Sequence, residues 1–212
     1  DEEGTYLGMV GSRTFCNLID HDKKELESAI KFSGEESLIE ALRRTKLFGQ
    51  KTASFDPTRH FAFFEAHIEQ GPFLEQTENK IGIVTGIVGI RGVKFVLTGE
   101  QNHAGTTPMF MRKDAGMQAI MLGSKINEEF EKSKGERTVW TFGDINFNPG
   151  SHSIIPGECE LYLQWRDDDE GQLNRFAYIV ENIVEKMNKK SKVQIEMIHL
   201  NNNCDPAPCD KN

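Results

Sequence analysis

The sequence predicts an α+β fold whose larger part has the element order βαββαβ. Apolar and polar residues alternate over 90–100 and 153–166, which is typical of strands that bury one face. Apolar residues recur at spacings of three and four over 108–132 and 171–190, which is typical of amphipathic helices. With two further strand patterns, this order predicts a ferredoxin-like split βαβ unit: four antiparallel strands with two helices on one face.

The elements of this unit follow in chain order. The first strand places Val93, Phe95 and Leu97 on one side, as a half-buried strand requires. A turn at Asn148-Pro149-Gly150 joins the second and third strands. We expect strands at Ile90–Glu100, Thr138–Phe147, Ser153–Arg166 and Val193–His199, and helices at Pro108–Lys132 and Gly171–Lys190.

The segment before this unit has weaker patterns. Two short helices are expected at Lys24–Phe32 and Glu36–Thr45, the second starting at Ser37 or at the Ser33-Gly34 pair before it. The aromatic run Phe61–His67 predicts a buried strand. We therefore divide the chain into a partial domain over 1–85, too small to enclose a good core alone, the βαββαβ domain over 86–202, and a return to the first domain over 203–212.

Composition excludes several classes of protein. The net charge is −8 with 27% charged residues, and no basic stripe indicates a nucleic-acid partner. No apolar run reaches the roughly 20 residues that span a bilayer. Residue 1 is Asp and no signal or transit peptide is visible, so we expect the chain to start inside a larger sequence or after a processed leader, and we assign no compartment. The four cysteines form no CxxC pair; free thiols are favoured, and a local Cys204–Cys209 disulfide stays open.

Two acidic or histidine-bearing motifs lie in the first segment. Adjacent Glu2 and Glu3 precede a glycine, and such carboxylates can divide metal ligation from proton transfer, although most acidic pairs are solvated surface. His67 ends the aromatic run and shares one strand face with Glu65 and Glu69. It can point into a cleft as a metal ligand, or it can be an ordinary histidine bonded to a carbonyl.

Two further motifs lie in the βαββαβ domain. His103 falls between a strand end and a helix start that Thr106 or Thr107 can cap, and its imidazole could donate to a developing oxyanion. The alternative is simple loop and cap chemistry. Arg166 ends a strand before the acidic run 167–170, where it can hold a carboxylate with two hydrogen bonds or pair with that run.

The order and spacing of these motifs resemble one family along essentially the whole chain. The matching stretches are Glu-Glu-Gly at Glu2, His-Ile-Glu-Gln-Gly-Pro at His67, Asn-His-Ala-Gly-Thr-Thr-Pro-Met at Asn102, Arg-Lys-Asp-Ala at Arg112, Ile-Pro-Gly at Ile155 and Arg-Asp at Arg166. They resemble allantoate amidohydrolases and N-carbamoyl-L-amino-acid hydrolases, with β-ureidopropionases and ureidoglycolate amidohydrolases, in the zinc aminoacylase/carboxypeptidase superfamily. The resemblance implies a partial α/β metallohydrolase catalytic domain followed by a lid that mediates dimerisation.

The resemblance also implies roles for individual residues. Glu2 would be the general base, Glu3 and His67 would ligate two divalent ions, zinc or manganese, and Gln70 would line the pocket. His103 would stabilise the oxyanion from the partner's lid, and Arg166 would bind the carboxylate of a small ureido substrate. Ser153 stands in a substrate-binding position where the family usually has Asn.

The resemblance leaves two hypotheses open. Family metal ligands would precede residue 1 and follow residue 212, and Gln164-Trp165 replaces the usual Asp-Ile before Arg166. We therefore expect either the central part of an active hydrolase of ureido C–N bonds or an inactive relative that serves as a dimerisation or structural subunit. The 212 residues alone are expected to show no appreciable hydrolysis.

Overall fold

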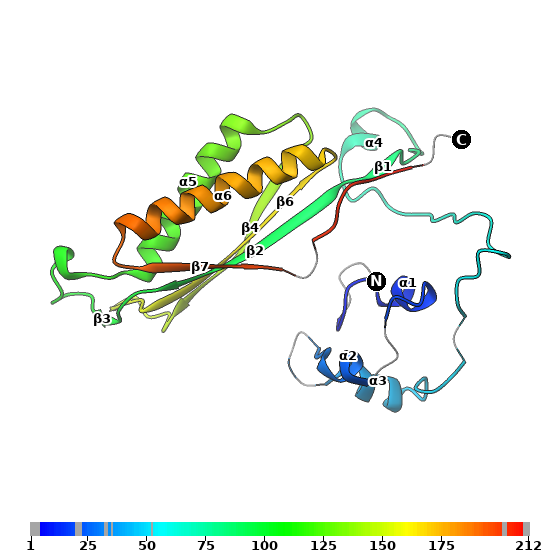
Figure 1. Ribbon diagram of the computed structural model, residues 1–212, viewed down its shortest axis with the longest axis horizontal. Helices are drawn as coiled ribbons and strands as arrows, with labels where there is room; N and C mark the ends of the chain where they lie inside the picture. The colour runs from blue at the N-terminus through cyan, green and yellow to red at the C-terminus, as the bar shows by residue number, and fades with distance from the viewer. Residues whose placement is uncertain are drawn as a thin grey trace. The chain divides into compact units, whose positions relative to one another are not determined.

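Strands are confined, among the described residues, to the second of the two units into which the chain divides, Asp1–Lys80 and Ile81–Asn212. The computed structural model describes residues 5–19, 23–31, 34, 36–51, 53–200 and 203–209. Figure 1 shows both units, and the mixture of helices and sheet agrees with the α+β class that the sequence predicts.

The described residues of the first unit form four short helices. Their bounds are α1 (Val10–Phe15), α2 (Lys23–Ser28), α3 (Leu38–Arg44) and α4 (Phe73–Gln76). The predicted start of α3 at Ser37 is confirmed, because Ser37 forms a reciprocal capping box with Glu40. The Glu40 carboxylate accepts a hydrogen bond from the Ser37 amide at 2.8 Å.

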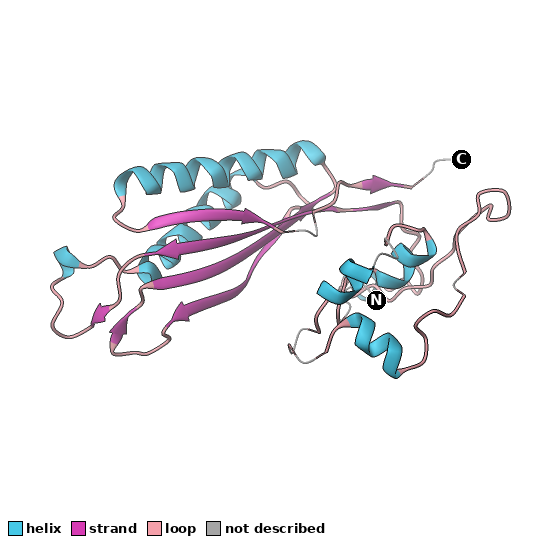
Figure 2. Ribbon diagram, turned by 60° about the horizontal axis from the view of Figure 1, so that its bottom comes forward, coloured by secondary structure: helices cyan, strands magenta, loops and turns pink. Residues whose placement is uncertain are grey.

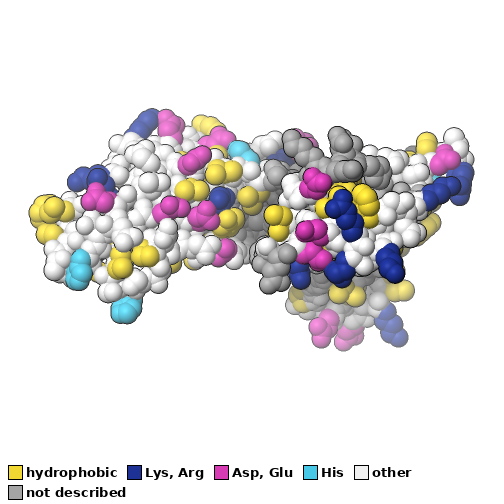
Figure 3. Space-filling view, turned by 90° about the horizontal axis from the view of Figure 1, so that it is seen from below, with side chains coloured by type: hydrophobic (Ala, Val, Ile, Leu, Met, Phe, Trp, Pro, Cys, Tyr) yellow, Lys and Arg dark blue, Asp and Glu magenta, His cyan; other side chains and the backbone are white. Residues whose placement is uncertain are grey.

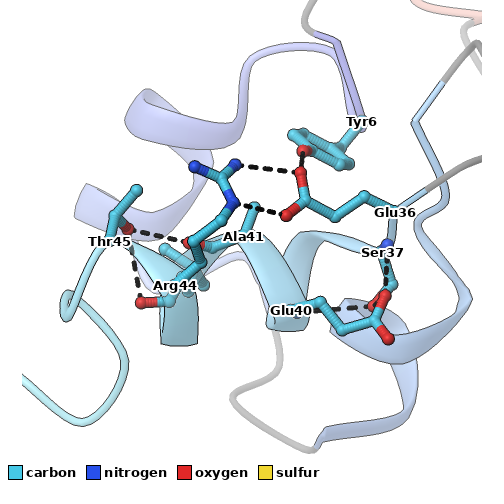
Figure 4. Close-up of polar contacts among 8 residues, drawn as sticks. Tyr6, Glu36, Ser37, Glu40, Ala41, Arg44 and Thr45 are labelled. Atoms are coloured by element: carbon cyan, nitrogen blue, oxygen red, sulfur yellow. Dashed lines mark hydrogen bonds and ion pairs between the residues drawn. The ribbon is translucent and has the colours of Figure 1, made fainter.

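Glu36 connects the segment before α1 to α3 through a charged network, shown in Figure 4. Its carboxylate accepts hydrogen bonds from the Tyr6 hydroxyl at 2.7 Å and from Arg44 Nε at 2.7 Å and Nη2 at 2.9 Å. The Arg44 guanidinium, and then the Tyr6 hydroxyl, lower the pKa of Glu36 from 4.5 to about 2. The folded first unit therefore favours the ionised form of Glu36.

The second unit is built on one antiparallel sheet with the strand order β4-β6-β2-β7. In Figure 2 both long helices lie on the same side of this sheet. Helix α5 contacts the β4 side of the sheet, and α6 contacts the β7 side. The bounds are β2 (Gly89–Thr98), α5 (Ala115–Ser133), β4 (Val139–Asn148), β6 (Glu158–Asp167), α6 (Glu170–Lys190) and β7 (Gln194–His199).

The core of the second unit lies between the sheet and these helices. Alternate residues of β6 are buried from Cys159 to Asp167, so one strand face meets the helices and the other stays partly open. Phe130 of α5 stacks on Phe176 of α6 with ring centroids 3.7 Å apart. The buried Trp165 indole donates to the Leu173 carbonyl at 3.1 Å. The alternation predicted over 153–166 is thus confirmed where it falls in β6.

Shorter pairings complete the second unit. Strand β1 (Gly86–Ile87) pairs with β8 (Ala207–Pro208), and Ile90 bridges Cys204, so residues 203–209 run antiparallel to 85–90. This extended course separates Cys204 from Cys209, and all four cysteines are free thiols. Burial raises the pKa of the Cys159 thiol to about 11. Within the described part of the chain, no helix has the length and apolarity that crossing a membrane demands.

Candidate active site

His103 lies at one end of the second unit, in a short two-stranded sheet. Strand β3 (Asn102–His103) pairs with β5 (Ile154–Ile155), and His103 is opposite Ile154. The Ala104 amide donates to the Ser153 carbonyl at 3.1 Å, so the structure brings Ser153 beside the His103 loop. Figure 3 shows histidine and apolar side chains exposed together at this end of the unit. The apolar side chains of this end include Met109, Phe110 and Met111, which are all exposed.

The His103 ring is held by its own loop. Its Nδ1 accepts hydrogen bonds from the amides of Gly105 at 3.0 Å and Thr106 at 3.2 Å. A Cβ added at Gly105 would lie only 3.2 Å from His103 Cε1, so a glycine gives the ring its room. One ring nitrogen, Nδ1, is therefore hydrogen-bonded to the main chain. The His103 side chain as a whole is exposed to solvent.

The helix after His103 begins later than the sequence predicts. Residues 109–111 form the 3-10 helix η1 (Met109–Met111), and α5 begins at Ala115 with Asp114 as its cap. The Asp114 carboxylate accepts from the Met117 amide at 2.9 Å. The expected caps Thr106 and Thr107 are therefore wrong, because the chain turns through η1 before a regular helix can start. Residues 104–112 are free to form the loop that presents His103.

An ion pair closes this loop at its base. Lys113 Nζ lies 2.9 Å from the Glu100 carboxylate, and the Glu100 amide donates to the Lys113 carbonyl at 2.8 Å. Lys113, and then Asn102, lower the pKa of Glu100. A Cβ on Gly99 would lie 2.0 Å from the Lys113 carbonyl oxygen, so this close approach requires a glycine.

Arg166 is near the end of β6, opposite Ile90 of β2 and Val139 of β4. Its side chain is half-buried, and its Nε donates to the Gln164 side chain at 2.9 Å. No ion pair joins Arg166 to the acidic run 167–170 within the part of the chain that is described. The acids of the run have other partners: Asp167 accepts from Thr138, Asp168 pairs with Arg137, and Asp169 caps α6.

His103 and Arg166 lie at opposite ends of the second unit, His103 in the two-stranded sheet and Arg166 in the four-stranded sheet. The His103 loop adjoins the end of β6 that starts at Glu158, and Arg166 is eight residues farther along that strand. At about 3.3 Å per residue, the two ends are separated by about 26 Å. In Figure 1, β3 lies at the far left and the start of α6, which follows Arg166 in the chain, lies toward the right. One small substrate cannot contact both residues of one subunit.

His67 and Gln70 belong to the first unit, in a stretch that is neither helix nor strand. Residues 61–70 are all described, yet none lies in a strand, and the predicted buried strand Phe61–His67 is wrong. Phe61 and Phe64 are 103% and 93% exposed. A strand needs a neighbour to pair its main-chain groups, and no described strand pairs with this stretch.

The side chains at the end of this stretch make local contacts. His67 Nδ1 contacts the Ile68 carbonyl. The Glu69 carboxylate accepts hydrogen bonds from the Phe73 and Leu74 amides of α4.

The metal centre that the resemblance implies cannot be built from the described residues. Glu2 and Glu3 lie outside them. Among the side chains that are described, no group of three or more His, Cys, Asp or Glu residues could hold a metal ion. The neighbouring Glu69 carboxylate is committed to capping α4.

Comparison with known proteins identifies the family. Residues 85–192 match the model of the peptidase dimerisation domain. The N-carbamoyl-L-amino-acid amidohydrolase of Paenarthrobacter aurescens is 34% identical over 180 residues, covering 82% of this chain and 42% of the relative. The allantoate amidohydrolase of Escherichia coli is 32% identical over 217 residues, covering 100% of this chain and 51% of the relative.

Solved structures agree with these relatives. The crystal structure of a hydantoinase/carbamoylase family amidase from Burkholderia phymatum has a TM-score of 0.81 and 37% sequence identity, covering 100% of this chain and 52% of that one. The chain thus spans about half the length of the proteins it matches. On these grounds, the chain belongs to the family of N-carbamoyl-L-amino-acid and allantoate amidohydrolases and carries its peptidase dimerisation domain.

Proposed function

We propose that the full-length protein hydrolyses the linear C–N bond of a ureido group in a small carboxylate substrate, such as allantoate, ureidoglycolate or an N-carbamoyl amino acid. The observation that carries this proposal is His103, presented by an ordered loop with one ring nitrogen committed and the side chain exposed. The alternative is an inactive relative that serves as a dimerisation or structural subunit. Retention of His67, His103 and Arg166 in family motifs favours the enzyme.

His103 would act by donating a hydrogen bond to the oxygen that gains negative charge when water attacks the ureido carbonyl. One such donor, fixed in advance, is worth roughly 10²- to 10³-fold in kcat. Arg166 would hold the substrate carboxylate, for which a guanidinium offers two parallel donors. Gln70 would line the substrate pocket of the full-length protein. Ser153, beside the His103 loop, would contribute a hydroxyl where the family usually supplies an amide.

We further propose that the second unit is a ferredoxin-like lid that forms a homodimer along β4. This strand is ten residues long and lies at an edge of the sheet, where its outer main-chain groups can pair with a second copy. The adjacent helix α5 exposes Met117, Ile120 and Met121 at helical spacing, with exposed fractions of 52%, 54% and 45%. A second copy would bury this apolar stripe.

A homodimer resolves the separation of His103 and Arg166. Because most of the length of β6, about 26 Å from Glu158 to Arg166, lies between the His103 loop and Arg166, we propose that each active site takes His103 from one subunit and Arg166 from the other. The first segment, 1–85, would be part of the catalytic domain, and residues 203–212 would begin its continuation. Zinc or manganese would be bound there by Glu3 and His67 with ligands from the rest of the protein, while Glu2 would serve as base.

The experiment is a combined assay of the full-length protein. We expect two equivalents of zinc or manganese in the purified protein and ammonia release from allantoate or an N-carbamoyl amino acid. A metal-replete, folded protein that releases no ammonia from any of these ureido carboxylates would favour the structural subunit. Absence of bound metal together with absence of activity would contradict the proposed chemistry.

A further inference from the structure

Arg112 makes two hydrogen bonds that the proposed chemistry has not used. It follows η1 directly, is half-buried, and sits where the His103 loop returns toward α5. Its Nη2 donates to the Ala104 carbonyl at 2.7 Å, and its Nε donates to the Thr107 carbonyl at 3.1 Å. Both acceptors are main-chain groups of one turn, so the guanidinium fixes the distance between them.

The residues between those two carbonyls are the ones that hold the imidazole. Gly105 and Thr106 lie between Ala104 and Thr107, and their amides point at His103 Nδ1. The Thr107 amide also donates to the His103 carbonyl at 3.2 Å. Arg112 therefore binds the carbonyls at the two ends of the turn, while His103 accepts from the two amides between them. A planar fork with fixed donor directions suits this bridging, whereas a lysine ammonium is a single point of charge.

The contacts at Nδ1 select one tautomer of His103. Two N–H groups aim at this nitrogen, so it must be an acceptor, and in the neutral ring the proton is then on Nε2. The other neutral tautomer would put an N–H against two N–H groups. If the turn opened, these amides would no longer discriminate between the tautomers. Nε2 would then carry the proton in only a fraction of the molecules, and the ring would no longer be held in one position.

We propose that Arg112 is a positioning residue that clamps the turn 104–107 and thereby keeps His103 in the tautomer with Nε2 as hydrogen-bond donor. The consequence for catalysis rests on the proposed function, because only there does Nε2 meet a developing oxyanion. The consequence for the ring itself does not, because it follows from hydrogen bonds within this loop.

The first test observes the ring directly in the full-length protein. Histidine side chains labelled with ¹⁵N are recorded by NMR, and the His103 signals are assigned by their loss in His103→Gln. We expect one tautomer, with Nδ1 unprotonated, in the native protein and a tautomer mixture in Arg112→Met. Arg91→Met is the matched control, because Arg91 also donates to a main-chain carbonyl, that of Cys204, at 2.7 Å, and should leave the His103 signals unchanged.

Either of two results would overturn the proposal: a native ring protonated on Nδ1, or an Arg112→Met variant that is folded and keeps the native tautomer. If Arg112→Met does not fold, Arg112→Lys replaces it. A lysine reaches only one carbonyl at a time, so a partial mixture is expected, and an unchanged single tautomer overturns the proposal equally.

The second test is a double-mutant cycle on ureido hydrolysis. Misplacing a catalytic group by about 1 Å can cost about 10²-fold, so Arg112→Met should lower kcat by roughly ten- to a hundredfold with KM nearly constant. In a His103→Ala background the same change should cost less than about twofold, because the residue it positions is gone. Equal losses in both backgrounds would mean a general structural role. A native protein without activity would defeat the proposed function while the NMR result still decides the role of Arg112.

Discussion

The separation of His103 and Arg166 makes a quantitative prediction for mixed dimers. We consider dimers that combine a His103→Ala subunit with an Arg166→Ala subunit, purified through two different affinity tags. If each site takes His103 from one subunit and Arg166 from the other, one site of the mixed dimer keeps both residues and the other site loses both. The mixed dimer should then have about half the native kcat/KM, although each parent dimer is nearly inactive.

The matched control carries the same two substitutions in a different arrangement. A native subunit combined with a His103→Ala/Arg166→Ala subunit should have almost no activity, because each of its sites then lacks one residue. The assay is ammonia release at a substrate concentration well below KM, where loss of either residue is visible. The reverse outcome, with an inactive mixed dimer and a control at about half activity, would mean that each site takes His103 and Arg166 from the same subunit, and would refute the proposed sharing of sites.

Three further predictions concern stability and reactivity. Because the pKa of Glu36 is lowered, its ion pair with Arg44 should stabilise the fold above pH 4.5 and lose this effect as pH falls toward 2. Glu36→Gln should remove this pH dependence of the free energy of unfolding, measured by urea titration. Native and variant curves of unfolding free energy against pH that run parallel would contradict the prediction. Cys159 should react with a thiol reagent only after unfolding, unlike the three exposed cysteines, and four rapid reactions would be inconsistent with its burial. Phe130→Ala should cost about 3–5 kcal/mol in denaturant titrations, and a cost below about 1 kcal/mol would argue against the stacked core.

Periodicity predicted the second unit well because its strands and helices bury one face each. Strand β6 alternates along its whole length, and the apolar stripe of α6 faces the core. The start of α5 was mispredicted because Thr106, Thr107 and Asp114 are all good caps. Sequence alone does not weigh one cap against another when a tight turn such as η1 intervenes.

Tertiary partners decided the features that the sequence did not predict. The aromatic run Phe61–His67 has the composition of a buried strand, but its residues lack a paired neighbour among the described strands. Arg112 was only part of a motif in the sequence, because its contacts are with main-chain carbonyls that leave no residue pattern. The placement of His103 and Arg166 at opposite ends of the second unit could have been inferred from the order of the strands. His103 lies next to the loop that precedes β6, whereas Arg166 lies near the end of β6, and a ten-residue strand separates the two ends.

We propose that the full-length protein is a ureido hydrolase in which His103 and Arg166 have different tasks. Steady-state ammonia release by His103→Ala and Arg166→Ala tests this most directly. We predict that His103→Ala mainly lowers kcat, by roughly 10²- to 10³-fold, and that Arg166→Ala mainly raises KM. Native kinetic constants in both variants would contradict the account.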